Sequence, residues 1–96
     1  MISTHVLDTE RGRPAAGVRV ELYRGDELVA AKETDADGRI AALGEDLVPG
    51  NYRLIFLPAS SPFFQRIEID ISLEDAGDIH VPLLLAPYSC TTYRGS

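Results

Sequence analysis

The sequence is poor in the residues that build metal sites, disulfides and membrane spans. Its 96 residues include one cysteine, Cys90, and two histidines, His5 and His80. One cysteine cannot form an internal disulfide, and these three side chains cannot fill a four-ligand zinc site within one chain. No apolar run approaches the roughly 18 residues that a membrane-spanning helix needs. We therefore expect neither a metal site nor a disulfide, and no membrane insertion.

Basic residues are also scarce. Nine Lys and Arg stand against 15 Asp and Glu, which gives a formal net charge of −6. Such a charge repels the phosphates of nucleic acids and anionic membranes. The first residues show neither the basic region nor the apolar region of a secretory signal. We expect no nucleic-acid or membrane partner and a cytoplasmic location.

The composition is that of an ordinary globular protein, with 45% hydrophobic and 25% charged residues. A chain of 96 residues has the length of one small domain. Residues 1–96 are therefore expected to form a single domain, and any function must come from one core and its surface.

Apolar and polar residues alternate in short runs that are interrupted by Gly, Pro and Asp, which is typical of β-strands. The clearest run, residues 67–74, alternates four aliphatic with four polar side chains. Further candidate strands cover residues 18–24, 28–34, 39–43, 52–57, 79–86 and 87–93. The pattern predicts an all-β sandwich or barrel of seven or eight strands.

The segment 79–86 is apolar at both odd and even positions, so we expect its second face to be an interface between copies of the chain. Pro82 cannot donate a backbone hydrogen bond, which predicts an edge strand or a bulge there. His80 lies within the same apolar segment. A buried imidazole is costly unless it is hydrogen-bonded, so a partner for His80 is expected.

Few side chains are suited to chemistry. His5 and His80 titrate near neutral pH, and Arg39, which follows a turn at residues 35–38, carries a fork of donors suited to carbonyl or carboxylate groups. The plainer interpretation makes the histidines hydrogen-bonded strand residues and Arg39 a solvated strand end. Cys90 is expected to be a packed side chain rather than a nucleophile.

The last residues follow an apolar strand directly, without a polar tail, which favours a docked terminus over an exposed stub. A docked terminus would supply the Arg94 cation and the Ser96 hydroxyl.

Three parts of the chain together resemble one family. Residues 3–9 (STHVLDT) with 12–18 (GRPAAGV) are similar to the opening of the 5-hydroxyisourate hydrolases, which are transthyretin-related proteins of purine catabolism. Residues 34–39 (TDADGR) resemble their arginine-bearing turn. Residues 80–88 (HVPLLLAPY) and the ending 93–96 (YRGS) are similar to their C-terminal region.

The resemblance implies a prealbumin-like (transthyretin-like) β-sandwich that assembles as a homotetramer, a dimer of dimers, and needs no cofactor. It also implies a catalytic set of His5, Arg39 and His80. Tyr93, Arg94, Gly95 and Ser96 would bind the substrate. The segment 57–62 is shorter than in the family, so we expect the family's short helix to be reduced or absent.

The implied reaction is the hydrolytic ring opening of 5-hydroxyisourate in urate degradation toward allantoin. One histidine would activate water while the other holds the water or the substrate, and Arg39 would stabilise the developing negative charge. Which histidine is the base stays open. The alternative is a non-catalytic carrier of small aromatic molecules, which would need neither the histidine and arginine set nor a fixed C-terminus.

Overall fold

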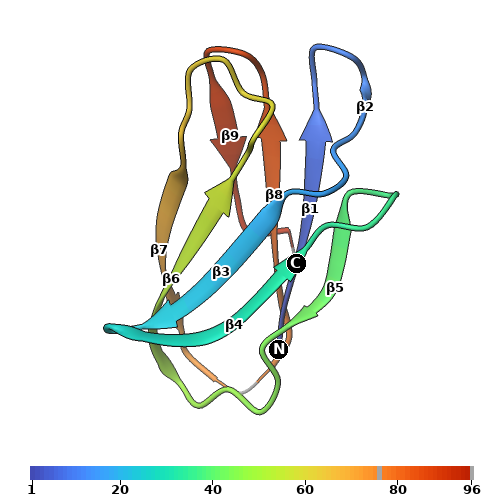
Figure 1. Cartoon of the computed structure of the whole chain (residues 1–96). Coiled ribbons are helices and arrows are strands. Elements are labelled where there is room, and N and C mark those ends of the chain that lie inside the picture. Colours follow the sequence, from blue (N-terminus) through green and yellow to red (C-terminus); the bar gives the residue numbers. More distant parts are fainter. Residues whose placement is uncertain (76, 96) are drawn as a thin grey trace.

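The computed structural model describes residues 1–75 and 77–95, and this part of the chain forms nine β-strands (Figure 1). Their bounds are Ile2–Asp8 (β1), Arg13–Pro14 (β2), Arg19–Arg24 (β3), Glu27–Glu33 (β4), Arg39–Leu43 (β5), Gly50–Leu57 (β6), Ile67–Leu73 (β7), Ile79–Leu85 (β8) and Cys90–Thr92 (β9). Sheet A has the strand order β2-β1-β8-β9, and β5 also pairs with β1. Sheet B has the order β4-β3-β6-β7.

The all-β sandwich predicted from the alternation is confirmed, and the described residues contain no helix. The segment 57–62 accordingly passes from β6 toward β7 without one. The seven candidate runs included neither β1 nor β2, which brings the count to nine, and β2 spans only Arg13–Pro14, too short to show any alternation. Within the described residues, no helix is long and apolar enough to cross a membrane.

The inward-facing side chains of the two sheets form the core. In β3, Val20 and Leu22 are buried, whereas Arg19 is exposed and Glu21 is half-buried, as the period of two requires. Burial contributes about 1.5–3 kcal/mol for each large apolar side chain. The largest fully buried apolar residues are Phe56, Ile2, Leu22, Leu43, Leu54, Leu83, Val6 and Val20.

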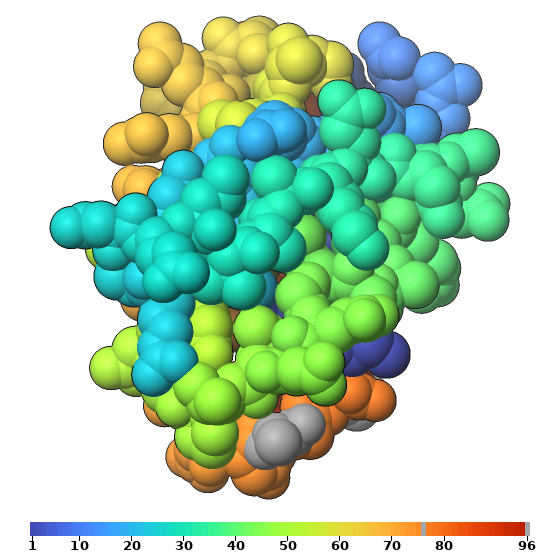
Figure 2. Space-filling view, turned by 60° about the horizontal axis from the view of Figure 1, so that its bottom comes forward, coloured from blue at the N-terminus to red at the C-terminus, as the bar shows by residue number. Residues whose placement is uncertain are grey.

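The two ends of the chain lie side by side in sheet A. β1 and β8 pair in parallel, from Ile2 opposite Ile79 to Asp8 opposite Leu85. The first residue reinforces this pairing, because the Met1 amine lies 3.2 Å from a carboxylate oxygen of Asp78. Figure 2 shows the N-terminal end (dark blue) between the segment around β5 (green) and the segment leading into β8 (orange).

The prediction of an edge strand or a bulge at Pro82 was wrong. β8 is an interior strand, bonded to β1 on one side and to β9 on the other, and its register with β1 is unbroken. The proline is tolerated because β9 pairs only with Leu83, Leu84 and Leu85, so the ladder ends before residue 82. At Pro82 the carbonyl oxygen instead accepts a hydrogen bond of 2.9 Å from Oγ1 of Thr92.

Candidate active site on the outer face of sheet A

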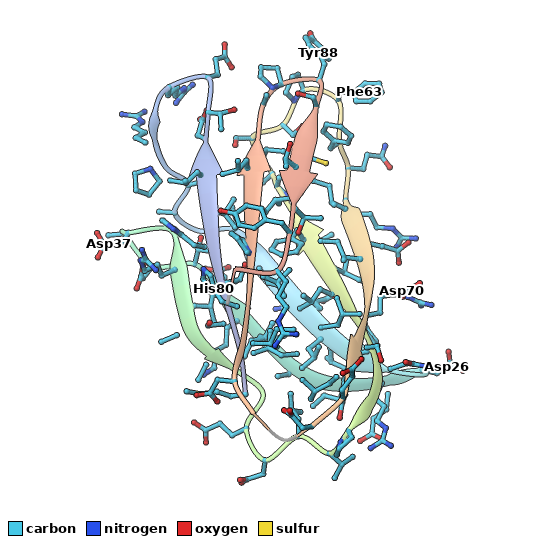
Figure 3. All side chains as sticks on the ribbon, turned by 180° about the vertical axis from the view of Figure 1, so that it is seen from behind. Asp26, Asp37, Phe63, Asp70, His80 and Tyr88 are labelled. Carbon is cyan, nitrogen blue, oxygen red and sulfur yellow. The ribbon has the colours of Figure 1, made fainter. Side chains whose placement is uncertain are left out.

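Alternate residues of β1 and β8 point away from the core, and we call the surface that they form the outer face of sheet A. On β1 these residues are Ser3, His5 and Leu7, all half-buried. On β8 they are His80, Pro82 and Leu84. Figure 3 views this sheet from outside and places His80 near its middle. The outer face therefore gathers both histidines of the chain.

Strand pairing brings Arg39 to the same face. Arg39 on β5 lies directly opposite His5 on β1, and directly paired residues of neighbouring strands project to the same side. In the adjoining ladder, His5 lies opposite Pro82, two residues from His80 on β8. All three residues proposed to be catalytic thus come together across three neighbouring strands, although 34 and 41 positions separate them in the sequence.

A hydrogen-bonded turn fixes the approach of Arg39 to β1. The side-chain oxygen Oδ1 of Asp35 accepts hydrogen bonds from the backbone N–H groups of Asp37 (2.9 Å) and Arg39 (3.0 Å). Gly38 has a φ of 74°, and a Cβ at this residue would lie 2.5 Å from the carbonyl oxygen of Val6. The turn can therefore pack against β1 only with glycine at position 38.

His80 has the partner that its apolar surroundings require. Nδ1 of His80 lies 2.9 Å from Oγ of Ser3, its neighbour in the parallel ladder. Analysis of the sequence did not identify Ser3 as part of the site. The available signal was its spacing, since Ser3 stands two residues before His5 and so faces the same side of β1.

The electrostatic environment of His80 disfavours its charged form. Burial lowers the pKa of His80 below its ordinary value of 6.5, and the positive charges of Arg39 and His5 lower it further. The ring is therefore neutral at neutral pH, when one nitrogen is a donor and the other an acceptor. A neutral imidazole beside a permanent guanidinium cation is suited to proton transfer and to binding an oxygen-rich substrate.

The C-terminal segment docks beside the histidine. After β9, the backbone N–H of Gly95 donates a 2.6 Å hydrogen bond to the carbonyl oxygen of His80. A Cβ at Gly95 would stand 2.6 Å from Cδ2 of the His80 ring, so this close approach requires glycine. The docked terminus expected from the sequence is thus present at Gly95, while Ser96 lies outside the described residues.

The two residues before Gly95 are placed differently. Tyr93 is 53% exposed. Together with Arg94 it lines an apolar hollow of about 190 Å³ at the edges of the sheets, beside Ile71 and Val81. Of the predicted substrate-binding tetrapeptide, the described contacts with His80 come from Gly95 alone.

A larger hollow of about 470 Å³ lies on sheet B, between Gly25, Arg53 and Asp70 among others. It contains none of the predicted site residues, and its two opposite charges are already paired, with Nε of Arg53 3.2 Å from Asp70. The concentration of titratable side chains, rather than the size of a cavity, therefore identifies the candidate site.

Comparisons with known protein sequences identify the family of this chain. The model of the HIUase/Transthyretin family matches residues 2–95. The chain is 43% identical over 112 residues to a 5-hydroxyisourate hydrolase of Caulobacter vibrioides, covering 99% of this chain and 97% of that protein. A 5-hydroxyisourate hydrolase of Pseudomonas aeruginosa is 39% identical over 115 residues, with coverage of 99% and 90%.

Solved structures are similar as well. The structure of Klebsiella pneumoniae 5-hydroxyisourate hydrolase superimposes with a TM-score of 0.89 at 38% identity, covering 99% of this chain and 98% of that one. Sea bream transthyretin, solved in complex with thyroxine, gives a TM-score of 0.85 at 28% identity, with coverage of 97% and 92%. The resemblance noted in the sequence is confirmed, and the chain belongs to the HIUase/transthyretin family.

Proposed function

We propose that this protein is a hydrolase that opens the ring of 5-hydroxyisourate with water, as a step in urate degradation. The observation that carries the proposal is the meeting of His5, Arg39 and His80 on the outer face of sheet A, with the docked C-terminal segment beside them. The relatives of Caulobacter and Pseudomonas that carry the name of this enzyme support the substrate and the reaction.

In the proposed reaction, a water oxygen bonds to the carbonyl carbon of an amide-type bond in the ring. One histidine accepts the proton of this water, and the other holds the water or the carbonyl group in place. The C–N bond then breaks, the ring nitrogen takes up the proton, and the product carries a new carboxylate. These steps need only side chains of the site and one water molecule.

Arg39 is proposed to bind the substrate's oxygens and to stabilise the negative charge that develops during attack. A preorganised donor of this kind contributes about 3–4 kcal/mol in other hydrolases. The net charge of −6 does not prevent an anionic substrate from binding next to Arg39. Solvent-exposed charges more than about 10 Å from the substrate are largely screened at 0.1 M salt. Tyr93, Arg94, Gly95 and Ser96 are proposed to complete the substrate-binding wall.

The active form is proposed to be a homotetramer, a dimer of dimers, in which a second copy covers the outer face of sheet A. This face presents half-buried Leu7 and Leu84 beside the buried Pro82, and the docked C-terminal segment lies next to His80. A single chain therefore offers one wall of a site and an apolar surface beside it. A second copy supplies the opposite wall and removes this apolar surface from water.

The proposal is tested by following the loss of ultraviolet absorbance of freshly generated 5-hydroxyisourate. We expect the protein to accelerate this loss well beyond spontaneous decay, at protein concentrations far below that of the substrate. A folded protein that leaves the decay unchanged would overturn the proposal. If the same protein bound thyroxine or another aromatic molecule stoichiometrically, the carrier alternative would take its place.

A further inference from the structure

The imidazole of His80 is held along both edges of its ring. On one edge, Nδ1 lies 2.9 Å from Oγ of Ser3. On the other edge, Gly95 packs so closely that a Cβ there would stand 2.6 Å from Cδ2. These contacts leave Nε2 and Cε1 at the outer end of the ring, away from the sheet. Among residues 1–75 and 77–95, Ser3 is the one side chain that is hydrogen-bonded to this ring.

The contact with Ser3 decides what the outer nitrogen can do. A neutral imidazole carries one proton, so one nitrogen donates and the other accepts. Whichever role Nδ1 takes toward Ser3, Nε2 therefore takes the opposite role toward the open face. Burial and the positive charges of Arg39 and His5 lower the pKa of His80, so the neutral form is the one that matters at neutral pH.

The balance of hydrogen bonds indicates the direction of the contact. Within the described chain, Nδ1 of His80 is the acceptor available to the Ser3 hydroxyl. If Ser3 donates, its proton and the Nδ1 lone pair are both satisfied, and only the Nε2 proton remains for a ligand. If Nδ1 donates, the hydroxyl proton and the Nε2 lone pair both lack a protein partner. The first arrangement is favoured because each unsatisfied, partly buried polar group costs free energy.

We propose that Ser3 is a positioning residue whose hydroxyl donates to Nδ1 of His80 and holds the ring with its proton on Nε2. The consequence for catalysis rests on the proposed function. His80 then donates a hydrogen bond from Nε2 to a substrate oxygen, next to Arg39, and His5 is the base that takes the proton of water. A lowered pKa suits this role, since it keeps the histidine neutral and weakens it as a base.

The tautomer is measured directly by nitrogen NMR of the wild-type protein labelled with ¹⁵N-histidine at neutral pH. Protonated and bare ring nitrogens resonate far apart, and with two histidines in the chain the His80 signals are assigned by their absence in His80→Asn. We expect a bare Nδ1 and a protonated Nε2. A protonated Nδ1 with a bare Nε2 overturns the proposal, whether or not the protein hydrolyses 5-hydroxyisourate.

Substitution of Ser3 tests the positioning role in turnover. Loss of a hydrogen bond that orients a metal-bound histidine costs about 10- to 100-fold, and by analogy we expect Ser3→Ala to lower kcat by about that factor with little change in KM. Ser3→Thr keeps a hydroxyl on the same strand and restores most of kcat. Ser72→Ala, at an exposed serine of β7, is the matched control.

Failure of the positioning role of Ser3 and failure of the proposed function give different results. An unchanged kcat and an unchanged His80 tautomer in Ser3→Ala contradict the positioning role even when the wild type is fully active. Conversely, a wild type without hydrolase activity overturns the proposed function, while its NMR spectrum still decides whether Ser3 donates to Nδ1.

Discussion

The imidazole of His80 lies where its charged form is disfavoured from two directions. Burial withdraws it from water, and Arg39 and His5 place positive charge nearby. Because a positive neighbour raises the free energy of the imidazolium, it lowers the pKa. Of the causes, burial is the largest, so removal of a neighbouring charge relieves only part of the shift.

Replacement of Arg39 by alanine is therefore expected to raise the pKa of His80 toward 6.5 without reaching it, because the effect of burial remains. The measurement is an NMR titration of the His80 ring. Arg53→Ala, which removes a cation paired with Asp70 on sheet B, serves as the control and leaves the titration unchanged. If the pKa of His80 is unchanged or lower in Arg39→Ala, the charge of Arg39 is not a cause of the lowered pKa.

Gly95 is the second residue on which the site depends. Gly95→Ala adds a Cβ 2.6 Å from Cδ2 of His80, a distance at which atoms must move. We expect the C-terminal segment to leave the ring and kcat/KM to fall at least tenfold. The thermal midpoint should change little, since the exposed tail contributes no buried core residue. Wild-type kcat/KM in Gly95→Ala would show that docking of the tail is dispensable.

At the scale of elements, the turn between β4 and β5 holds Arg39 against β1. The backbone N–H of Val6 donates to the carbonyl oxygen of Gly38 at 2.8 Å, next to the pairing of His5 with Arg39. A Cβ at Gly38 would collide with the carbonyl oxygen of Val6. Displacement of this turn would therefore move Arg39 away from His5.

Gly38→Ala tests this dependence, and Gly12→Ala is a matched control. Both glycines have similar positive φ angles, 74° and 68°, but a Cβ at Gly12 meets nothing within 4 Å. Both variants share the cost of a left-handed alanine, and overpacking adds about 1–3 kcal/mol at Gly38 alone. Urea unfolding should show this difference between the two free energies of unfolding. Equal losses would mean that the turn adapts without strain.

Alternation within the sequence predicted single strands well. The predicted strand at 67–74 corresponds to β7 (Ile67–Leu73), and the predicted strand at 18–24 corresponds to β3 (Arg19–Arg24). Strand partners were not predictable, because a period of two indicates which face is buried and carries no information about the neighbouring strand. The parallel pairing of β1 with β8 is such a case, and for that reason the bond between Ser3 and His80 was missed.

At the scale of the whole molecule, the short chain builds only one wall of the proposed site. The outer face of sheet A presents its histidines beside half-buried Leu7 and Leu84. Residues 1–75 and 77–95 form one two-sheet sandwich, and both histidines lie on the outer side of one of its sheets. In the proposed tetramer a second copy encloses the pocket, so activity and assembly should be lost together.

Leu84→Arg places a charge on the outer face of sheet A and should produce smaller assemblies with little activity. Desolvating an unpaired charge in an interface costs several kcal/mol, whereas the isolated chain keeps the arginine in water. Light scattering after size-exclusion chromatography measures the assembly, and circular dichroism confirms the fold. Leu28→Arg, at a β4 residue that is 46% exposed, is the control. An active tetramer of Leu84→Arg would place the interface elsewhere.

The most direct test of the account compares the hydrolysis of 5-hydroxyisourate by the wild type and by the double variant His5→Asn, His80→Asn, with thermal unfolding used to confirm that both are folded. We predict rapid turnover by the wild type. In the double variant kcat should fall by about 10²- to 10⁴-fold, the contribution typical of a positioned acid or base. A wild-type rate equal to spontaneous decay, or full activity in the double variant, would contradict the account.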